Sequence, residues 1–202
     1  MALTFLERFR TASPTPAPVV FDGLAQVRAY WEALRTDSLP ARLSLDPRGL
    51  AGVLDRVFIA ERIGKGLAQV RIAGSGLADF AGLDLRGLPL SCLFASESRG
   101  IFGEVLERVF ATPSVAEIDL GADRGTQGTV VARILLMPLR TEGDRQQLLG
   151  AIGFNAASHS RCKFQVLARR EERLVLPSAP AAAAAPTPVR RKAHLTLVHS
   201  NH

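Results

Sequence analysis

Histidine, the side chain best suited to general acid–base catalysis and metal binding, is absent from the first 158 residues. All four histidines, at positions 159, 194, 199 and 202, lie at or beyond the end of the last expected core strand. His159 and Cys162 form an H-x-x-C pair, but two ligands do not make a zinc site, which needs four. We therefore expect no metal site and no imidazole base in the folded part.

Motifs for nucleotide binding and nucleophilic catalysis are also missing. The sequence contains neither G-x-x-x-x-G-K-[ST] nor G-x-S-x-G. Gly74 and Gly76 follow an expected strand, as in a G-x-G-x-x-G dinucleotide site, but the third glycine position is Asp79. A carboxylate there would repel a pyrophosphate instead of letting the backbone approach it. We expect that the protein is not an enzyme.

Residues 70–87 organise the middle of the chain. The segment begins as a strand, breaks at Gly74, continues through a short helical turn, and ends at Gly82 and Gly87, where glycine permits positive φ. Apolar periodicity predicts the elements on either side. These are a helix over 23–35, strands at 57–63 and 67–73 joined by a turn at 64–66, a helix over 97–111, and strands at 115–120, 129–139 and 147–154.

Three stretches carry a resemblance to a known family. They are the passage from Arg71 to Gly87, the Leu39-Pro40-Ala41-Arg42 segment leading to Asp46-Pro47, and the strand from Val57 to Glu61. In order and spacing they resemble a PAS domain, and more closely the small single-domain PAS proteins of alphaproteobacteria, over about residues 30–154. The residues matching the family motif are Pro40, Arg42, Asp46, Pro47, Arg71, Gly74, Gly82 and Gly87.

The resemblance implies an α+β fold, with a five-stranded antiparallel sheet and helices on one face. The predicted element order agrees with it. We expect an N-terminal helix and Pro-rich leader at 1–18, the PAS-like domain at 19–160, and a basic extension at 161–176 that either lengthens the last strand or forms a short helix. An Ala/Pro-rich tail at 177–202 is expected to be disordered, with a docking peptide as the alternative.

The basic net charge does not belong to the expected domain. The chain has 25 basic and 19 acidic residues, and eight of the basic and two of the acidic ones follow residue 160. The first 160 residues thus carry 17 of each, and a neutral body argues against specific nucleic-acid binding. The sequence contains no secretory signal and no apolar run long enough for a transmembrane segment. These features predict a cytoplasmic protein.

The cofactors found in other PAS domains do not fit this sequence. Haem-binding members use a histidine on the middle helix, and residues 95–111 contain none. Flavin-binding photoreceptors place a reactive cysteine near the position of Cys92, but the polar residues that would hold the flavin are absent around it. We therefore predict neither haem nor flavin, and interpret Cys92 as a buried apolar side chain.

Two functions remain after these exclusions. The first is a non-catalytic signalling protein in a bacterial regulatory pathway, which acts by contact with itself as a homodimer or with another signalling protein. The alternative is a sensor that binds an apolar ligand or metabolite in the PAS pocket. The candidate lining of that pocket, which also describes an ordinary core, is Phe80, Leu93, Phe94, Phe102, Leu106 and Ile134.

Overall fold

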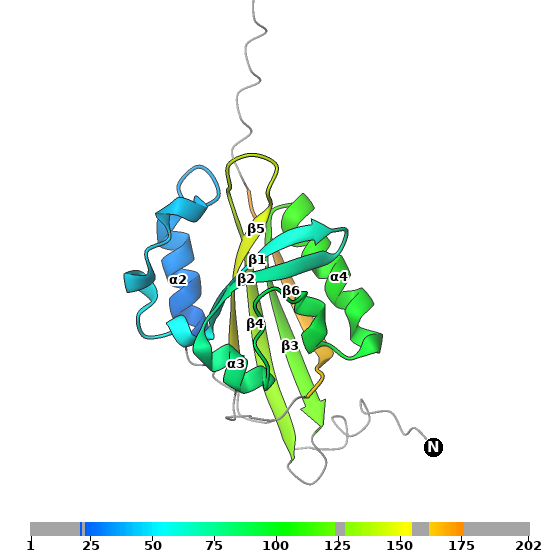
Figure 1. Cartoon of the computed structure of the whole chain (residues 1–202). Helices are drawn as coiled ribbons and strands as arrows, with labels where there is room; N and C mark the ends of the chain where they lie inside the picture. Colours follow the sequence, from blue (N-terminus) through cyan, green and yellow to red (C-terminus); the bar gives the residue numbers. More distant parts are fainter. Residues whose placement is uncertain (1–20, 22, 124–127, 155–161, 176–202) are drawn as a thin grey trace, which may run out of the picture.

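The computed structural model describes residues 21, 23–123, 128–154 and 162–175. Its helices are α2 (Leu24–Leu34), α3 (Ser75–Ala81) and α4 (Ser96–Ala111), and its strands are β1 (Val57–Gly64), β2 (Leu67–Ala73), β3 (Ser114–Asp123), β4 (Thr129–Leu139), β5 (Gln147–Phe154) and β6 (Gln165–Arg173) (Figure 1). Four short 3₁₀ turns are η1 (Arg42–Ser44), η2 (Pro47–Leu50), η3 (Leu54–Arg56) and η4 (Leu90–Leu93). The leader predicted at 1–18 and the tail predicted at 177–202 lie outside the described residues.

All strands belong to one antiparallel sheet in the order β2-β1-β5-β4-β3-β6. The α+β class and the antiparallel pairing are confirmed, and the hairpin between β1 and β2 turns where it was predicted. The strand count is corrected from five to six. Part of the basic extension forms β6, a separate strand that pairs with β3 along its whole length instead of lengthening β5.

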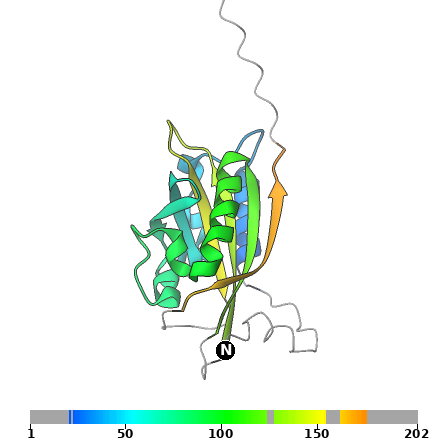
Figure 2. The ribbon, with the colours of Figure 1, turned by 90° about the vertical axis from the view of Figure 1, so that its right-hand side faces the viewer.

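The sheet has helices on both faces rather than on one. Along β4, Ile134 and Leu136 join the core beneath α3 and α4, whereas Leu135 and Met137 join a second core beneath α2. This alternation follows from the two-residue period of a strand. In α2, the indole Nε1 of Trp31 donates to the carbonyl of Pro138 at 3.1 Å. Figure 2 shows α2 and α4 on opposite sides of the sheet.

The sixth strand is held by charged side chains rather than by a buried apolar face. Residues 168–173 are exposed, yet four of them form ion pairs with other elements. The pairs are Arg108–Glu171 at 2.5 Å, Arg169–Glu104 at 3.4 Å, Arg170–Asp119 at 3.4 Å, and Arg28–Glu172. Glu171 thus ties β6 to α4, and Glu172 ties it to α2. At the start of the segment, buried Phe164 adds an apolar anchor.

Acid is expected to weaken the attachment of β6. Hydrogen bonds from Arg108 lower the pKa of Glu171 below its ordinary value of 4.5. The unfolded chain therefore binds more protons than the folded chain below about pH 5, and this contribution to stability is lost as the pH falls through the folded pKa. Urea unfolding at pH 6 and again at lower pH should show the loss.

The matched variants for this measurement are Glu171→Gln and Glu142→Gln. The glutamine at 171 removes the titrating group, so that variant should be less stable than the wild type at pH 6 and lose less stability on acidification. Glu142 makes no hydrogen bond or ion pair with any described residue, so its variant should follow the wild type. An unchanged acid response in Glu171→Gln would contradict the role given to this pair.

Within the part of the chain that the structure describes, no helix has the length and hydropathy needed to cross a membrane.

Candidate functional site

The six residues predicted to line a pocket lie together in the core beneath α3 and α4. Each is at most 3% exposed, and all belong to one apolar cluster: Phe80, Leu93, Phe94, Phe102, Leu106 and Ile134. The Phe94 and Phe102 rings stack with centroids 4.0 Å apart. The Phe80 ring stacks on Phe154 at 4.3 Å and on Phe164 at 5.1 Å. These side chains therefore pack against one another in the part of the core where the sequence predicts a pocket.

Cys92 lies at the edge of this core and is partly exposed. Burial raises the pKa of its thiol, and the charges of Lys163 and Arg99 oppose that shift without reversing it. Because the thiolate is the reactive form, the raised pKa works against a nucleophilic role. Among the described residues, no three His, Cys, Asp or Glu side chains are grouped so that they could hold a metal ion. The four histidines all lie outside those residues.

The motif residues near the start of the domain form the connection between α2 and the sheet. The carbonyl of Pro40 accepts from the Arg140 amide at 2.9 Å, which places the next residues against the β4–β5 loop. Asp46 then begins η2: its carboxylate accepts from the Arg48 amide at 2.9 Å, and Pro47 occupies the first helical position. Asp46 is thus the N-cap of η2.

The glycines of the motif serve backbone geometry. Gly82 and Gly87 have φ of +65° and +79°, which favour glycine, and Gly82 is the residue that ends α3. Gly74 instead has an ordinary φ of −66° and is required by close packing. A Cβ added there would lie 2.2 Å from the carbonyl oxygen of Leu54 and 2.4 Å from the backbone of Asp55.

Four of the motif residues, Arg42, Asp46, Pro47 and Gly74, line one hollow on the α2 side of the sheet. The hollow lies between the segment that carries η1, η2 and η3 and the strands β1, β2 and β5, and its volume is about 390 Å³. Its apolar lining comes from Leu45, Pro47, Leu50, Leu54, Val57, Phe58, Ile59, Ile72, Ala73 and Leu149, and the two carboxylates in the lining are those of Asp46 and Asp55. The structure therefore brings together motif residues that are far apart in the sequence.

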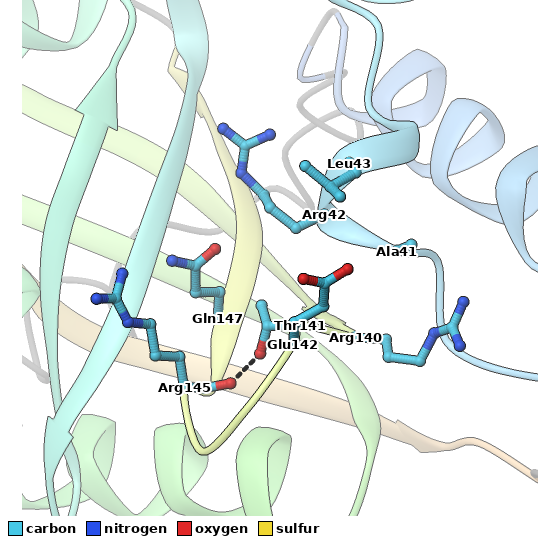
Figure 3. Close-up of a pocket in the computed structure, with 8 residues that line it drawn as sticks. All are labelled: Ala41, Arg42, Leu43, Arg140, Thr141, Glu142, Arg145 and Gln147. Carbon is cyan, nitrogen blue, oxygen red and sulfur yellow. Dashed lines mark hydrogen bonds between the residues drawn. The ribbon is translucent and has the colours of Figure 1, made fainter.

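A second hollow, of about 450 Å³, shares Arg42, Ile59 and Ile72 with the first. It adds Arg71, Arg145, Glu61 and Gln147 to the lining. We call the two adjoining hollows the sheet-face groove, with an apolar end at Leu50 and a basic end at Arg145. A third hollow, of about 310 Å³, continues from the basic end between Arg42 and the β4–β5 loop (Figure 3).

The only carboxylate lining the basic end is already engaged. Glu61 accepts from Gln147 Nε2 at 3.0 Å and from the Arg71 guanidinium at 3.2 Å. These hydrogen bonds, that from Gln147 first, lower the pKa of Glu61. By contrast, the guanidinium groups of Arg42 and Arg145 form no hydrogen bond or ion pair with any described residue. The basic end thus holds three arginines and one carboxylate, and the charge of Arg145 also helps to lower the pKa of Glu61.

Sequence reasoning found Arg42 and Arg71 through the motif but missed Arg145, Gln147 and Ile72. Gln147 reaches Glu61 because β5 pairs with β1, across 86 residues of sequence. No local pattern specifies that register. The charged character of the 140–145 loop was visible in the sequence, but its position beside Arg42 was not.

Comparison with known proteins supports the fold assignment. A family model described as a PAS domain matches residues 21–153, about two thirds of the chain. No curated protein matches the chain, and no solved structure does. The matched range includes the motif residues, every residue of the sheet-face groove, and both cores except the residues beyond 153, such as Phe164 and Leu174. The chain therefore belongs to the PAS domain family.

Proposed function

We propose that this protein is a non-catalytic PAS signalling protein that acts by protein–protein contact in the cytoplasm of a bacterium. Membership of the PAS family supports a signalling or sensory role. Such domains often mediate dimerisation and other protein interactions, and we propose a homodimer and a further signalling protein as the partners. The signal would then pass through the surface of the domain rather than through a bound cofactor.

The filled core beneath α4 is the observation that carries this proposal. Protein interiors are close-packed, so a ligand can enter only where side chains leave room for it. Here Phe102 is stacked on Phe94, and Phe80 is stacked between two other rings. An apolar ligand among these side chains would have to displace at least one of them. Contact at the surface requires no such rearrangement.

Native mass spectrometry of the full chain tests the proposal against the alternative, a sensor with an apolar ligand or metabolite among the six predicted residues. Contact signalling predicts the mass of the polypeptide alone, in monomer and dimer peaks that respond to protein concentration. A reproducible added mass that is present on the wild type and lost in Leu106→Phe would favour the sensor, because that substitution fills the core and leaves the surface of the sheet unchanged. A protein that stays monomeric and recovers no partner from lysate would count against contact.

Added benzene gives a direct test of space in the core. The wild type should not bind it, whereas Phe102→Ala, which removes a buried ring, should create an apolar cavity and bind it. The variant shows that the assay detects such binding. Saturable binding by the wild type, lost when Leu106 is changed to Phe, would place a pocket among the six residues and overturn the proposal.

A further inference from the structure

The sheet-face groove has two chemically different ends that meet at Arg42. One end is lined mainly by apolar side chains, with the carboxylates of Asp46 and Asp55 among them, and the other mainly by guanidinium groups beside Glu61 and Gln147. Arg42 lines both hollows and the third one beside them. We propose that this groove binds a single-chain amphiphilic anion, with its apolar body at the Leu50 end and its carboxylate or phosphate head at Arg42 and Arg145.

The apolar end has the size and surface for such a body. Its volume of about 390 Å³ falls in the range of small-molecule sites. Ile72, on its wall, is 49% exposed, although the surrounding side chains of Leu50, Val57 and Ile59 are buried. A bound hydrocarbon chain would cover this exposed surface and gain free energy in proportion to the apolar area removed from water.

The basic end selects the sign of the head group. Arg71 is paired with Glu61, so Arg42 and Arg145 are the two cations of the basic end without an ion pair, and the carboxylate of Glu142 lines the third hollow beside them. In Figure 3 both side chains extend on the side of Gln147, while Arg140 points away from them. Guanidinium groups bind carboxylates and phosphates through paired N–H donors. A cationic head would be repelled by these two charges, and a neutral head would form no ion pair with either arginine.

This site is separate from the core on which the proposed function rests. The groove lies on the α2 side of the sheet, whereas the residues expected to bind an apolar ligand lie beneath α4. The two proposals can therefore fail independently. A filled core does not depend on whether the groove binds an anion, and a ligand in the groove does not require space in the core.

Calorimetric titration of the full chain with decanoate, kept below its micelle concentration, tests the proposal. Decanoate should bind, while decanol and decyltrimethylammonium should bind at least about tenfold more weakly, since a charged hydrogen bond is worth more than a kilocalorie per mole. Acetate, which has the head without the body, should also bind weakly. Equal binding of decanol, or of acetate, would overturn the proposal.

Matched variants locate the site. Arg42→Ala combined with Arg145→Ala should weaken decanoate binding about tenfold or more. Arg48→Ala, which removes a neighbouring exposed arginine outside the groove, should bind decanoate with an affinity within about twofold of the wild type. At the apolar end, Ile72→Glu should abolish binding. Ile63→Glu should not, because Ile63 is 51% exposed on the adjoining strand and lines neither hollow.

Urea unfolding of each variant confirms that it is folded before its affinity is interpreted. If the control variants lose affinity as much as the groove variants, decanoate binds elsewhere and the proposal is wrong. Sedimentation with phosphatidylglycerol vesicles distinguishes a free amphiphile from a lipid surface. Binding to vesicles without binding to decanoate would also overturn the proposal.

Discussion

Phe102→Ala is expected to lower the free energy of unfolding by about 3–5 kcal/mol. Phe102 lies on the buried side of α4, is fully buried, and stacks on Phe94 with ring centroids 4.0 Å apart. Truncation removes the transfer free energy of the ring and leaves a cavity that the rigid sheet beneath α4 cannot close. Urea unfolding followed by circular dichroism measures the change, and the slope of the unfolding free energy with urea concentration should be the same in both proteins.

Ile101→Ala is the matched control, one position earlier on the same helix. Ile101 is 41% exposed, so its truncation leaves no internal cavity and should change the stability by no more than about 0.5 kcal/mol. Phe102→Leu should fall between the two because it restores part of the lost volume. A loss below about 1.5 kcal/mol for Phe102→Ala would mean that the ring is loosely packed, and would favour the ligand-sensor alternative.

The helix that carries Phe102 was predictable because its sequence is strongly periodic. The apolar residues at 101, 102, 105, 106, 109 and 110 are predicted to lie on one side of the helix, and the structure buries all of them except Ile101, which is 41% exposed. The stripe on α2 was equally clear, with Leu24, Val27 and Trp31 buried. What the sequence did not specify was the face that α2 covers, because both faces of the sheet are apolar and either could receive such a stripe.

The sixth strand, in contrast to α4, could not be predicted from the local sequence pattern. The segment from Gln165 to Arg173 ends in a run of charged residues, which lacks the apolar alternation that indicates a strand. Its stability as a strand comes from pairing with β3 and from ion pairs with Glu104, Arg108 and Arg28. Those partners are 63 to 144 residues away in sequence. Short-range pattern analysis therefore left its structure open between strand and helix.

Only part of the sheet-face groove could be predicted from the sequence. The motif gave Arg42, Asp46, Pro47 and Gly74 from short matches, but not the reason for their association. They converge because the η1–η3 segment lies over β1 and β5, and because β2 returns through the hairpin beside β1. Arg145 and Gln147 enter through the pairing of β5 with β1, which only the assembled sheet reveals.

Gly74→Ala is expected to destabilise the protein by about 2 kcal/mol or more, because of crowding rather than backbone conformation. The residue has φ of −66° and ψ of 153°, which alanine adopts freely. The obstacle is the η3 backbone: the new Cβ would lie 2.2 Å from the Leu54 carbonyl oxygen and 2.4 Å from the Asp55 carbonyl carbon and oxygen. Backbone atoms cannot move aside as a flexible side chain does. Relief requires that η3 separate from the start of α3, which would also strain the hydrogen bond from the Gly74 amide to the Val57 carbonyl at 2.8 Å.

Gly100→Ala provides the control with the same chemical change and the opposite expected sign. Gly100 lies within α4, and a Cβ built there meets no atom within 4 Å. Alanine should therefore stabilise the helix by about 0.5–1 kcal/mol, since it loses less conformational entropy than glycine on folding. Urea unfolding of both variants compares crowding with helix propensity directly. If Gly74→Ala were as stable as the wild type, η3 would not be packed against this glycine as the structure shows. The wall that Gly74 and Leu54 form in the sheet-face groove would then be wrong.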